Sequence, residues 1–340
     1  MHTKRNINPQ FISFQMINRA LIRIKVVQQT YAYYQNGSNK LDLAEKELSF
    51  SLSKSYDLYL YMLELMVELN RMAERAYITA TNRHNRLRDG AAPSARFVNN
   101  RFIAQLEKNR QLRDFAENQK KTWVDEEDYV RRLYNRIVES ETYKEWMAST
   151  KEPTYDEEKT LWRHLYRRVI MEDEELDHLL EEKSLFWNGD RFIVDSFVLK
   201  TLKLFTPKSG ADQPLLPEYN DEEDPEFARR LLRASLLGAD HYRTIIAQSL
   251  HNWEIERVAL MDLIIMQTAL AEMLTFPQIP VTVTINEYVD IAKFYSTPRS
   301  GSYINGMLDA IARRLIDEGK LKKTMDAKPA AGAPDETDNE

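Results

Sequence analysis

The sequence lacks cysteine entirely, which excludes disulfide bonds and thiolate metal sites. This absence fits a reducing compartment, so we expect a cytoplasmic protein. Glycine and proline are also scarce, with nine and twelve among 340 residues. Because helix formers dominate the remainder, the composition favours an all-α protein with short connections. No run of about eighteen apolar residues occurs, so we expect no membrane partner. No apolar run follows the basic N-terminal residues either, so we do not expect secretion.

Acidic residues are absent from residues 1–40, although the whole chain has a net charge of −6. The overall charge does not indicate a general nucleic-acid binder. The charged residues of 71–121 are also mostly basic, and each of these two regions can present a basic face to a phosphate backbone. The alternative is that long helices here carry mixed charge only to remain solvated. In the second region the arginines that lie closest together are Arg83, Arg86, Arg88, Arg96 and Arg101.

Helical periodicity extends over most of the chain. Residues 16–35 place an apolar stripe on one face, which is typical of an amphipathic helix. A helical pattern continues from about residue 41 to residue 88, and the stretch 186–205 suits a strand or a helix, of which its neighbours favour the helix. The other helical patterns cover about 95–121, 125–148, 155–184, 225–238, 239–252, 254–275, 284–296 and 301–319.

Residues 282–311 contain the clearest pattern of the chain, two helical repeats that meet at a short break. Thr284 and Glu287 have the spacing of a capping box, which predicts that a helix begins there. Pro298 prevents that helix from continuing. The stretch is therefore a helix–helix corner.

The residues directly after this break point to an anion site. Ser300 or Ser302 is expected to cap the second helix, whose free N–H groups would lie beside Arg299. Tyr303 follows in the first turn, where its ring can stack on an unpaired base. The alternative is an ordinary corner with a packed tyrosine.

Three motifs carry a family resemblance. They are "RRLLRASLLGADHYRTIIAQSLHNWEIERVALMDLIIMQTALAEML", "IPVTVTINEYVDIAKFY" and "SGSYINGMLDAI", and "NRALIRIKVVQQTYAYYQ" lies upstream. Residues 16–35 and 226–318 resemble the first helix and the C-terminal part of the NusB family of transcription antitermination factors. The resemblance implies an all-helical bundle, here with a large helical insertion between the first helix and the C-terminal helices. The segments are then 1–40 (basic N-terminal helix), 41–205 (insertion), 206–225 (Pro-rich acidic linker), 226–320 (C-terminal bundle) and 321–340 (disordered tail).

The family resemblance also implies a function. NusB-like proteins bind the boxA RNA of ribosomal RNA leaders together with the ribosomal protein NusE, within the transcription elongation complex. RNA contacts carried over from the family fall on Arg19, Arg23, Ser300, Ser302 and Tyr303, with Arg299 nearby as a compensating cation. The same resemblance implies that Asn305 and Gly306 serve the turn and close packing.

The partner-binding positions implied by the resemblance are Tyr31 and Asp262, on the side that faces NusE. This sequence departs from the family pattern in two places. Ala20 and Leu21 stand where relatives often carry arginine, and Ser302 stands where they usually carry a basic residue. An alternative function follows from these differences. The chain would then be a helical protein–protein scaffold that kept the fold and lost boxA recognition.

Catalytic motifs are missing from the sequence. It contains no P-loop, G-x-G-x-x-G, G-x-S-x-G or HExxH motif. Glu175 and His178 have the Glu-x-x-His spacing of a metal ligand pair, but the second copy that a di-iron bundle needs does not occur. We therefore expect a protein that is not an enzyme and that needs neither metal nor cofactor.

Overall fold

The computed structural model describes residues 16–37, 40–88, 91–119, 122–219, 221–250, 255–323 and 325. All regular elements among these residues are helices, and no strand occurs there, so the all-α prediction is confirmed. The chain divides into two compact units. Unit 1 consists of Met1–Ile17 and Ser51–Asn220, and unit 2 of Asn18–Phe50 and Asp221–Glu340. The predicted tail, from residue 321 on, lies outside the described residues at 324 and 326–340.

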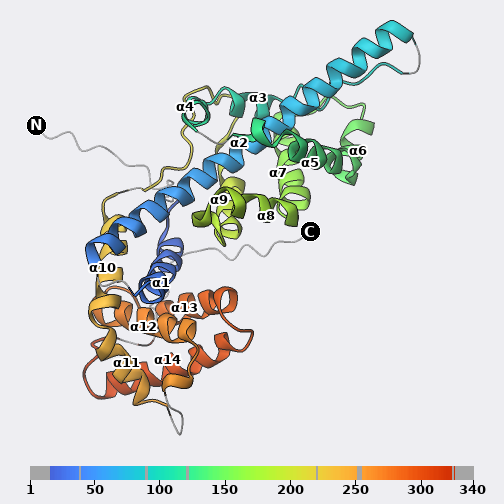
Figure 1. Ribbon diagram of the computed structural model, residues 1–340. Coiled ribbons are helices and arrows are strands. Elements are labelled where there is room, and N and C mark those ends of the chain that lie inside the picture. The colour runs from blue at the N-terminus through green and yellow to red at the C-terminus, as the bar shows by residue number, and fades with distance from the viewer. Residues whose placement is uncertain are drawn as a thin grey trace, which may run out of the picture. The chain divides into compact units, whose positions relative to one another are not determined.

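Unit 2 is a bundle of helices around one apolar helix, α12. Residues of α12 are buried on every side from Asp262 to Met273, as expected for a helix that is apolar all round. The helices α1, α10, α11, α13 and α14 all pack against it. The helices of this bundle (Figure 1) are α1 (Arg19–Gln35), α10 (Glu223–Leu237), α11 (Ala239–Ala247), α12 (Leu260–Thr275), α13 (Val281–Tyr295) and α14 (Ser300–Asp317).

Helix α1 belongs to this bundle although about 190 residues of sequence separate it from α10. Asn18 caps it, because its side chain accepts a hydrogen bond from the Leu21 N–H at 3.0 Å. Leu21, Ile24 and Val27 are buried, and the helix packs against α10 and α12. The predicted amphipathic first helix therefore forms, and it docks on the C-terminal bundle.

The corner between α13 and α14 forms as predicted, but its helix caps differ. Helix α13 begins at Val281 after Pro280, so the predicted start at Thr284 is wrong. The Thr284 hydroxyl instead donates a hydrogen bond of 2.8 Å to the buried Glu272 carboxylate. Helix α14 begins at Ser300 with Arg299 at the cap position, and no side chain caps it there. The predicted serine cap is therefore wrong.

Unit 1 contains the long helix α2 (Leu41–Leu87) from Ser51 onward and a set of shorter helices beside it (Figure 1). The helical pattern predicted for residues 41–88 is confirmed. In the ambiguous stretch 186–205, residues Arg191–Leu204 form helix α9, so the preferred helix is confirmed for most of that stretch. The other elements are α3 (Arg101–Glu107), α4 (Arg110–Asn118), η1 (Trp123–Glu126), α5 (Glu127–Glu139), α6 (Glu141–Ala148), α7 (Tyr155–Leu165), η2 (Tyr166–Ile170, a π-helix), α8 (Glu174–Lys183), η3 (Leu185–Trp187) and α9 (Arg191–Leu204).

The segment 206–219, predicted as part of a linker, packs onto unit 1. Leu215 and Leu216 are buried, and the Leu216 N–H donates to the Tyr59 hydroxyl at 3.2 Å. Tyr56 donates to the Leu216 carbonyl at 3.0 Å. An extended segment without helix is thus held by side chains of α2. The segment limits predicted at residues 40, 205, 225 and 320 stay predictions.

Candidate nucleic-acid interface

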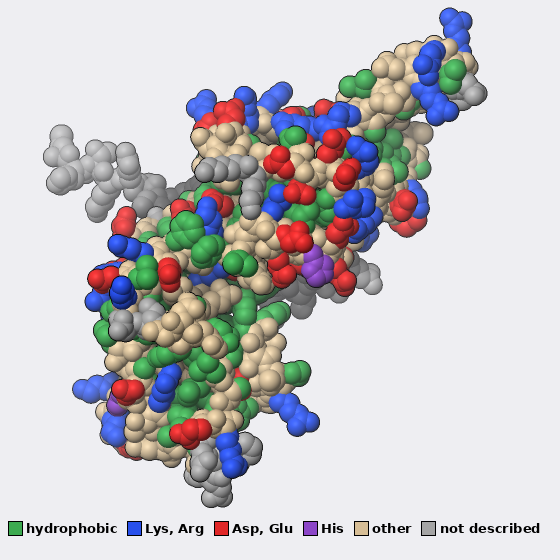
Figure 2. Space-filling view, viewed as in Figure 1, with side chains coloured by type: hydrophobic (Ala, Val, Ile, Leu, Met, Phe, Trp, Pro, Cys, Tyr) green, Lys and Arg blue, Asp and Glu red, His purple; other side chains and the backbone are tan. Residues whose placement is uncertain are grey.

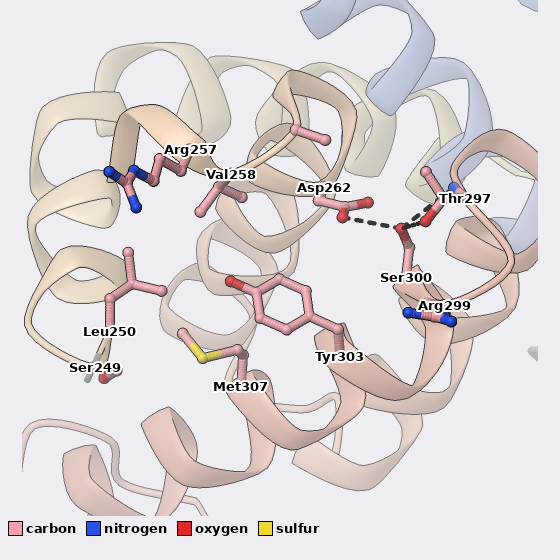
Figure 3. A pocket seen from close by; sticks show the side chains of 11 residues that line it. Ser249, Leu250, Arg257, Val258, Asp262, Thr297, Arg299, Ser300, Tyr303 and Met307 are labelled. Carbon is pink, nitrogen blue, oxygen red and sulfur yellow. Dashed lines mark hydrogen bonds between the residues drawn. The ribbon is translucent and has the colours of Figure 1, made fainter. Parts of the chain in front are cut away.

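A cavity of about 660 Å³ lies at the α13–α14 corner of unit 2 (Figure 3). Its wall is mainly apolar, and the charged residues that line it are Arg257, Asp262 and Arg299. The corner predicted from the sequence as an anion site therefore borders a hollow. The lining residues are Ser249, Leu250, Arg257, Val258, Ala259, Asp262, Thr297, Arg299, Ser300, Tyr303 and Met307.

Asp262 holds the corner together from the first turn of α12. Its carboxylate accepts hydrogen bonds from the Ser296 hydroxyl at 2.5 Å and from the Ser300 hydroxyl at 2.9 Å. Ser300 Oγ also accepts from the Thr297 N–H at 3.2 Å. Because an acid near helix N-termini interacts favourably with their dipoles, Asp262 stabilises the start of both α12 and α14.

Tyr303 supplies an aromatic face to the cavity. Its side chain is 37% exposed and lies between Met307 and the Arg299 side of the cavity (Figure 3). Partial burial, and then the nearby Asp262 carboxylate, raise the pKa of the phenol above its ordinary value. The ring is therefore neutral at physiological pH and accessible on one side. A flat, sequence-tolerant stacking surface of this kind suits an unpaired base.

Two arginines line the same cavity as Tyr303, and the predicted contact Ser302 lies outside its lining. Arg257 and Arg299 line the cavity from different elements, η4 (Ile255–Arg257) and the N-cap of α14. Arg299 and Ser302 are exposed, and the Ser302 hydroxyl donates 3.1 Å to the Arg299 carbonyl. Guanidinium groups bind phosphate oxygens in pairs of hydrogen bonds. The cavity thus combines a stacking surface with cationic groups.

Arg23, a predicted RNA contact, is buried in an internal ion-pair network. Its guanidinium donates to the fully buried Glu272 carboxylate at 2.7 and 3.0 Å and to Glu287 at 3.2 Å. Burial acts to lower the pKa of Arg23, but the bonded Glu272 outweighs it and raises that pKa. Tyr288 donates to the same Glu272 at 3.3 Å. These bonds occupy Arg23 within the bundle.

Arg19 and Tyr31 lie on the same helix as Arg23 and are more accessible. Arg19 is 37% exposed, pairs with Asp224 at 3.4 Å and stands over the Phe227 ring. Tyr31 is half-buried, and its hydroxyl accepts from the Gln35 amide at 2.8 Å. Of the predicted site residues, the cavity brings together Arg299, Ser300, Tyr303 and Asp262. The three predicted residues of α1 do not line it.

Several cavity residues were not predicted from the sequence. Met307 follows Tyr303 by one helical turn, so helical spacing could have identified it. Leu250 and Val258 lie in the sequence between α11 and α12, and no pattern in the sequence marks them. Asn305 and Gly306, expected to serve close packing, are instead exposed on α14, and a Cβ built on Gly306 would meet no atom within 4 Å. That packing prediction is wrong.

Comparison with known proteins identifies the family. Residues 208–313 match the model of the NusB family. The chain is 41% identical over 133 residues to the transcription antitermination protein NusB of Salinibacter ruber, and this match covers 83% of that protein and 37% of this chain. The chain belongs to the NusB family. The transcription antitermination protein NusB of Geobacter sulfurreducens is 39% identical over 117 residues, which cover 85% of that protein and 33% of this chain.

A solved structure of T. maritima NusB is also similar, with 26% identity, a TM-score of 0.27, and coverage of 44% of this chain and 90% of that one. The match to the NusB family begins at residue 208, so the helices α3–α9 lie outside it. This member of the NusB family therefore carries a long helical region between its first helix and its C-terminal bundle, as predicted.

Neither a metal-binding cluster nor a membrane-spanning helix occurs in the described ranges of the chain. These residues contain no group of three or more His, Asp or Glu side chains placed to hold a metal ion. Glu175, half of the Glu-x-x-His pair, is bonded to Arg132 and Arg136. In the described part of the chain, no helix has the length and apolar character that a bilayer crossing requires.

Proposed function

We propose that this NusB-family protein is a transcription antitermination factor that binds boxA-type RNA of ribosomal RNA leaders. In this proposal it acts with the ribosomal protein NusE in the transcription elongation complex. The observation that carries the proposal is the cavity at the α13–α14 corner, where the accessible Tyr303 ring lies beside the exposed Arg299. The relatives with this bundle are named transcription antitermination proteins, which supports the same function.

The RNA contacts divide between direct and indirect ones. Tyr303 stacks on one base, while Arg299 and Ser302 bind the adjoining phosphate and Arg19 extends the contact from α1. Ser300 acts indirectly, since its hydroxyl is buried against Asp262. Arg23 also acts indirectly, because its bonds to Glu272 hold α1 against α12.

The NusE contact rests on the family resemblance at Tyr31 and Asp262. Tyr31 offers a half-exposed ring to a partner, and the buried Asp262 shapes the α13–α14 corner through its bonds to Ser296 and Ser300. The binding of RNA and of NusE needs no covalent chemistry, so the proposed function is not enzymatic.

A protein–protein scaffold is the second candidate function. It is favoured by the internal engagement of Arg23 and Ser300, which leaves fewer groups for RNA than the sequence implies. A scaffold would bind NusE and would not distinguish boxA from other RNA.

Substitution of Tyr303 tests the RNA proposal. Tyr303→Ala removes the stacking face, so affinity for a fluorescent boxA oligonucleotide should fall by ~1–3 kcal/mol in an anisotropy titration. Tyr303→Phe keeps the ring and should bind nearly as well as wild type. Thermal melting of both variants controls for folding. Equal boxA affinity in Tyr303→Ala and wild type, with equal melting, would refute the stacking role.

A further inference from the structure

The C-terminal end of α2 and Arg88, the residue just after it, form an arm of residues 75–88 that leaves the body of unit 1. Figure 1 shows this end of the helix extending beyond the other helices of the unit. None of its residues is buried, and Ile78 and Leu87 are 56% and 53% exposed. Earlier in the same helix, residues such as Leu63, Met66 and Leu69 are fully buried. The core therefore holds one part of α2 and leaves the arm in solvent.

The charge of the α2 arm has one sign. Its sequence, "RAYITATNRHNRLR", contains four arginines and no Asp or Glu. The side chains of Arg83, Arg86 and Arg88 make no hydrogen bond or ion pair with another described residue. Figure 2 shows Lys and Arg side chains gathered at the end of the arm. Other basic residues of this region are engaged, since Arg101 pairs with Glu158 and Arg96 donates to the Lys151 carbonyl.

The sequence of the α2 arm gives an isolated helix little support. Without acids it has no helical ion pairs, and Arg83 and Arg86 repel each other at a spacing of three residues. Ile78, Thr79 and Thr81 are β-branched, which lowers helix propensity. A polyanion that neutralises the arginines would relieve this repulsion and favour the helix.

Helical geometry places Arg75, Arg83 and Arg86 on one stripe of the arm. At 100° per residue they fall within an arc of about 80°, and at 1.5 Å per residue the stripe is about 16 Å long. Guanidinium groups suit phosphate oxygens because each can donate two parallel hydrogen bonds. The stripe can therefore follow several phosphates of one strand.

The apolar residues of the arm do not suit other partners. A helix that docks in a protein groove needs apolar anchors one and two turns apart, and a membrane-surface helix needs a broad apolar face. The positions one and two turns after Ile78 on its face are Asn82 and Asn85. We propose that the α2 arm binds the phosphate backbone of RNA outside the boxA element, independently of sequence. The choice of RNA rests on the proposed function.

The test compares two RNAs in anisotropy titrations over a range of salt concentrations. One is the boxA oligonucleotide alone, and the other carries boxA with a long flanking extension. The variant combines Arg83→Gln, Arg86→Gln and Arg88→Gln, since glutamine keeps helix propensity. It should bind the long RNA on the order of tenfold more weakly, with a salt slope lower by about 2, because each phosphate contact contributes about 0.7. Affinity for the short oligonucleotide should not change.

A control variant has the same change of charge elsewhere in unit 1. It combines Arg131→Gln, Lys144→Gln and Lys151→Gln, whose side chains are 57%, 56% and 74% exposed. An unchanged salt slope in the arm variant, or an equal loss in the control variant, would overturn the proposal. A long RNA with scrambled boxA separates the two proposals. If wild type binds the scrambled and the boxA long RNA equally well, and the arm variant binds both more weakly, the boxA proposal fails and the arm proposal stands.

Discussion

At the scale of single residues, the buried carboxylate of Glu272 fixes the position of α1. It receives hydrogen bonds from Arg23 of α1 and from Thr284 and Tyr288 of α13. A buried charge is tolerated when it is paired and its remaining lone pairs are satisfied, and loss of one partner leaves the other uncompensated. A segment that covers α12 at this place must therefore supply a cation for Glu272, as α1 does with Arg23.

Substitution of Arg23 should destabilise unit 2. Arg23→Met leaves Glu272 buried without its cation, so the free energy of unfolding should fall by about 3–5 kcal/mol in urea denaturation. Arg19→Gln removes a partly exposed pair and should cost at most about 1 kcal/mol. Combining Arg23→Met with Glu272→Leu should recover part of the loss. Wild-type stability of Arg23→Met would show that the pair is not formed.

Glu64 makes the stability of unit 1 depend on pH. Burial, and then the nearby Glu68, raise the pKa of Glu64 to about 7, against the opposing effect of Arg71. Its Oε2 has no hydrogen-bond partner. Between these two pKa values, Glu64 is protonated in the folded protein, whereas in the unfolded chain, with a pKa of 4.5, it has lost its proton. Stability should therefore fall as pH rises from about 4.5 through about 7.

Glu64→Gln should remove this pH dependence. At pH 8 the variant should be more stable than wild type by a few kcal/mol, since one pKa unit corresponds to about 1.4 kcal/mol. At pH 5 the difference should be small, because wild-type Glu64 is protonated. Thermal melts at both pH values measure this. Glu117→Gln, at a 70% exposed side chain, is the control. A constant difference at both pH values would contradict the assignment.

At the scale of elements, α14 contains an exposed glycine that its packing does not require. Gly306→Ala adds a Cβ that meets no atom within 4 Å. The substitution should stabilise the helix by roughly 0.5–1 kcal/mol, since glycine is the weaker helix former. Gly301→Ala should gain less, because its Cβ would lie 3.2 Å from Lys293 Cγ. A melting temperature lowered by Gly306→Ala would indicate a contact that the helix does not show.

Helix α1 is the element on which the bundle depends. A fragment of residues 221–323 lacks it, so the apolar surface of α10 and α12 that covers Leu21, Ile24 and Val27 becomes exposed. We expect this fragment to aggregate in size-exclusion chromatography and to be rescued in part by a peptide of residues 16–37. A monomeric fragment that melts cooperatively and ignores the peptide would contradict this packing.

The helices could be predicted from the sequence because their signals are local. The apolar repeat of residues 16–35 predicted α1. The helical pattern from residue 41 to residue 88 predicted α2 almost to its last residue. The Thr284 cap failed because its hydroxyl has a better acceptor in Glu272, on another helix. Arg23 has the sequence context of an exposed arginine, and its partner is 249 positions away. Contacts of that range leave no local pattern.

At the scale of the whole molecule, each unit offers a different surface to the same class of ligand. Unit 2 supplies a cavity with Tyr303 and Arg299, which suits one base and its phosphate. Unit 1 supplies the basic α2 arm, which suits a backbone without regard to sequence. If both surfaces bind, the chain would join a specific contact to a salt-dependent one on a single RNA.

Specific recognition of boxA is the central claim, and one titration tests it most directly. Wild-type protein, with and without NusE, is titrated against a boxA oligonucleotide and a scrambled oligonucleotide of equal length and composition at physiological salt. We predict that boxA binds at least about tenfold more tightly, as expected when base contacts add to the phosphate contacts, and that NusE increases the affinity further. Equal affinity for the two RNAs under both conditions would contradict the account and favour the protein–protein scaffold.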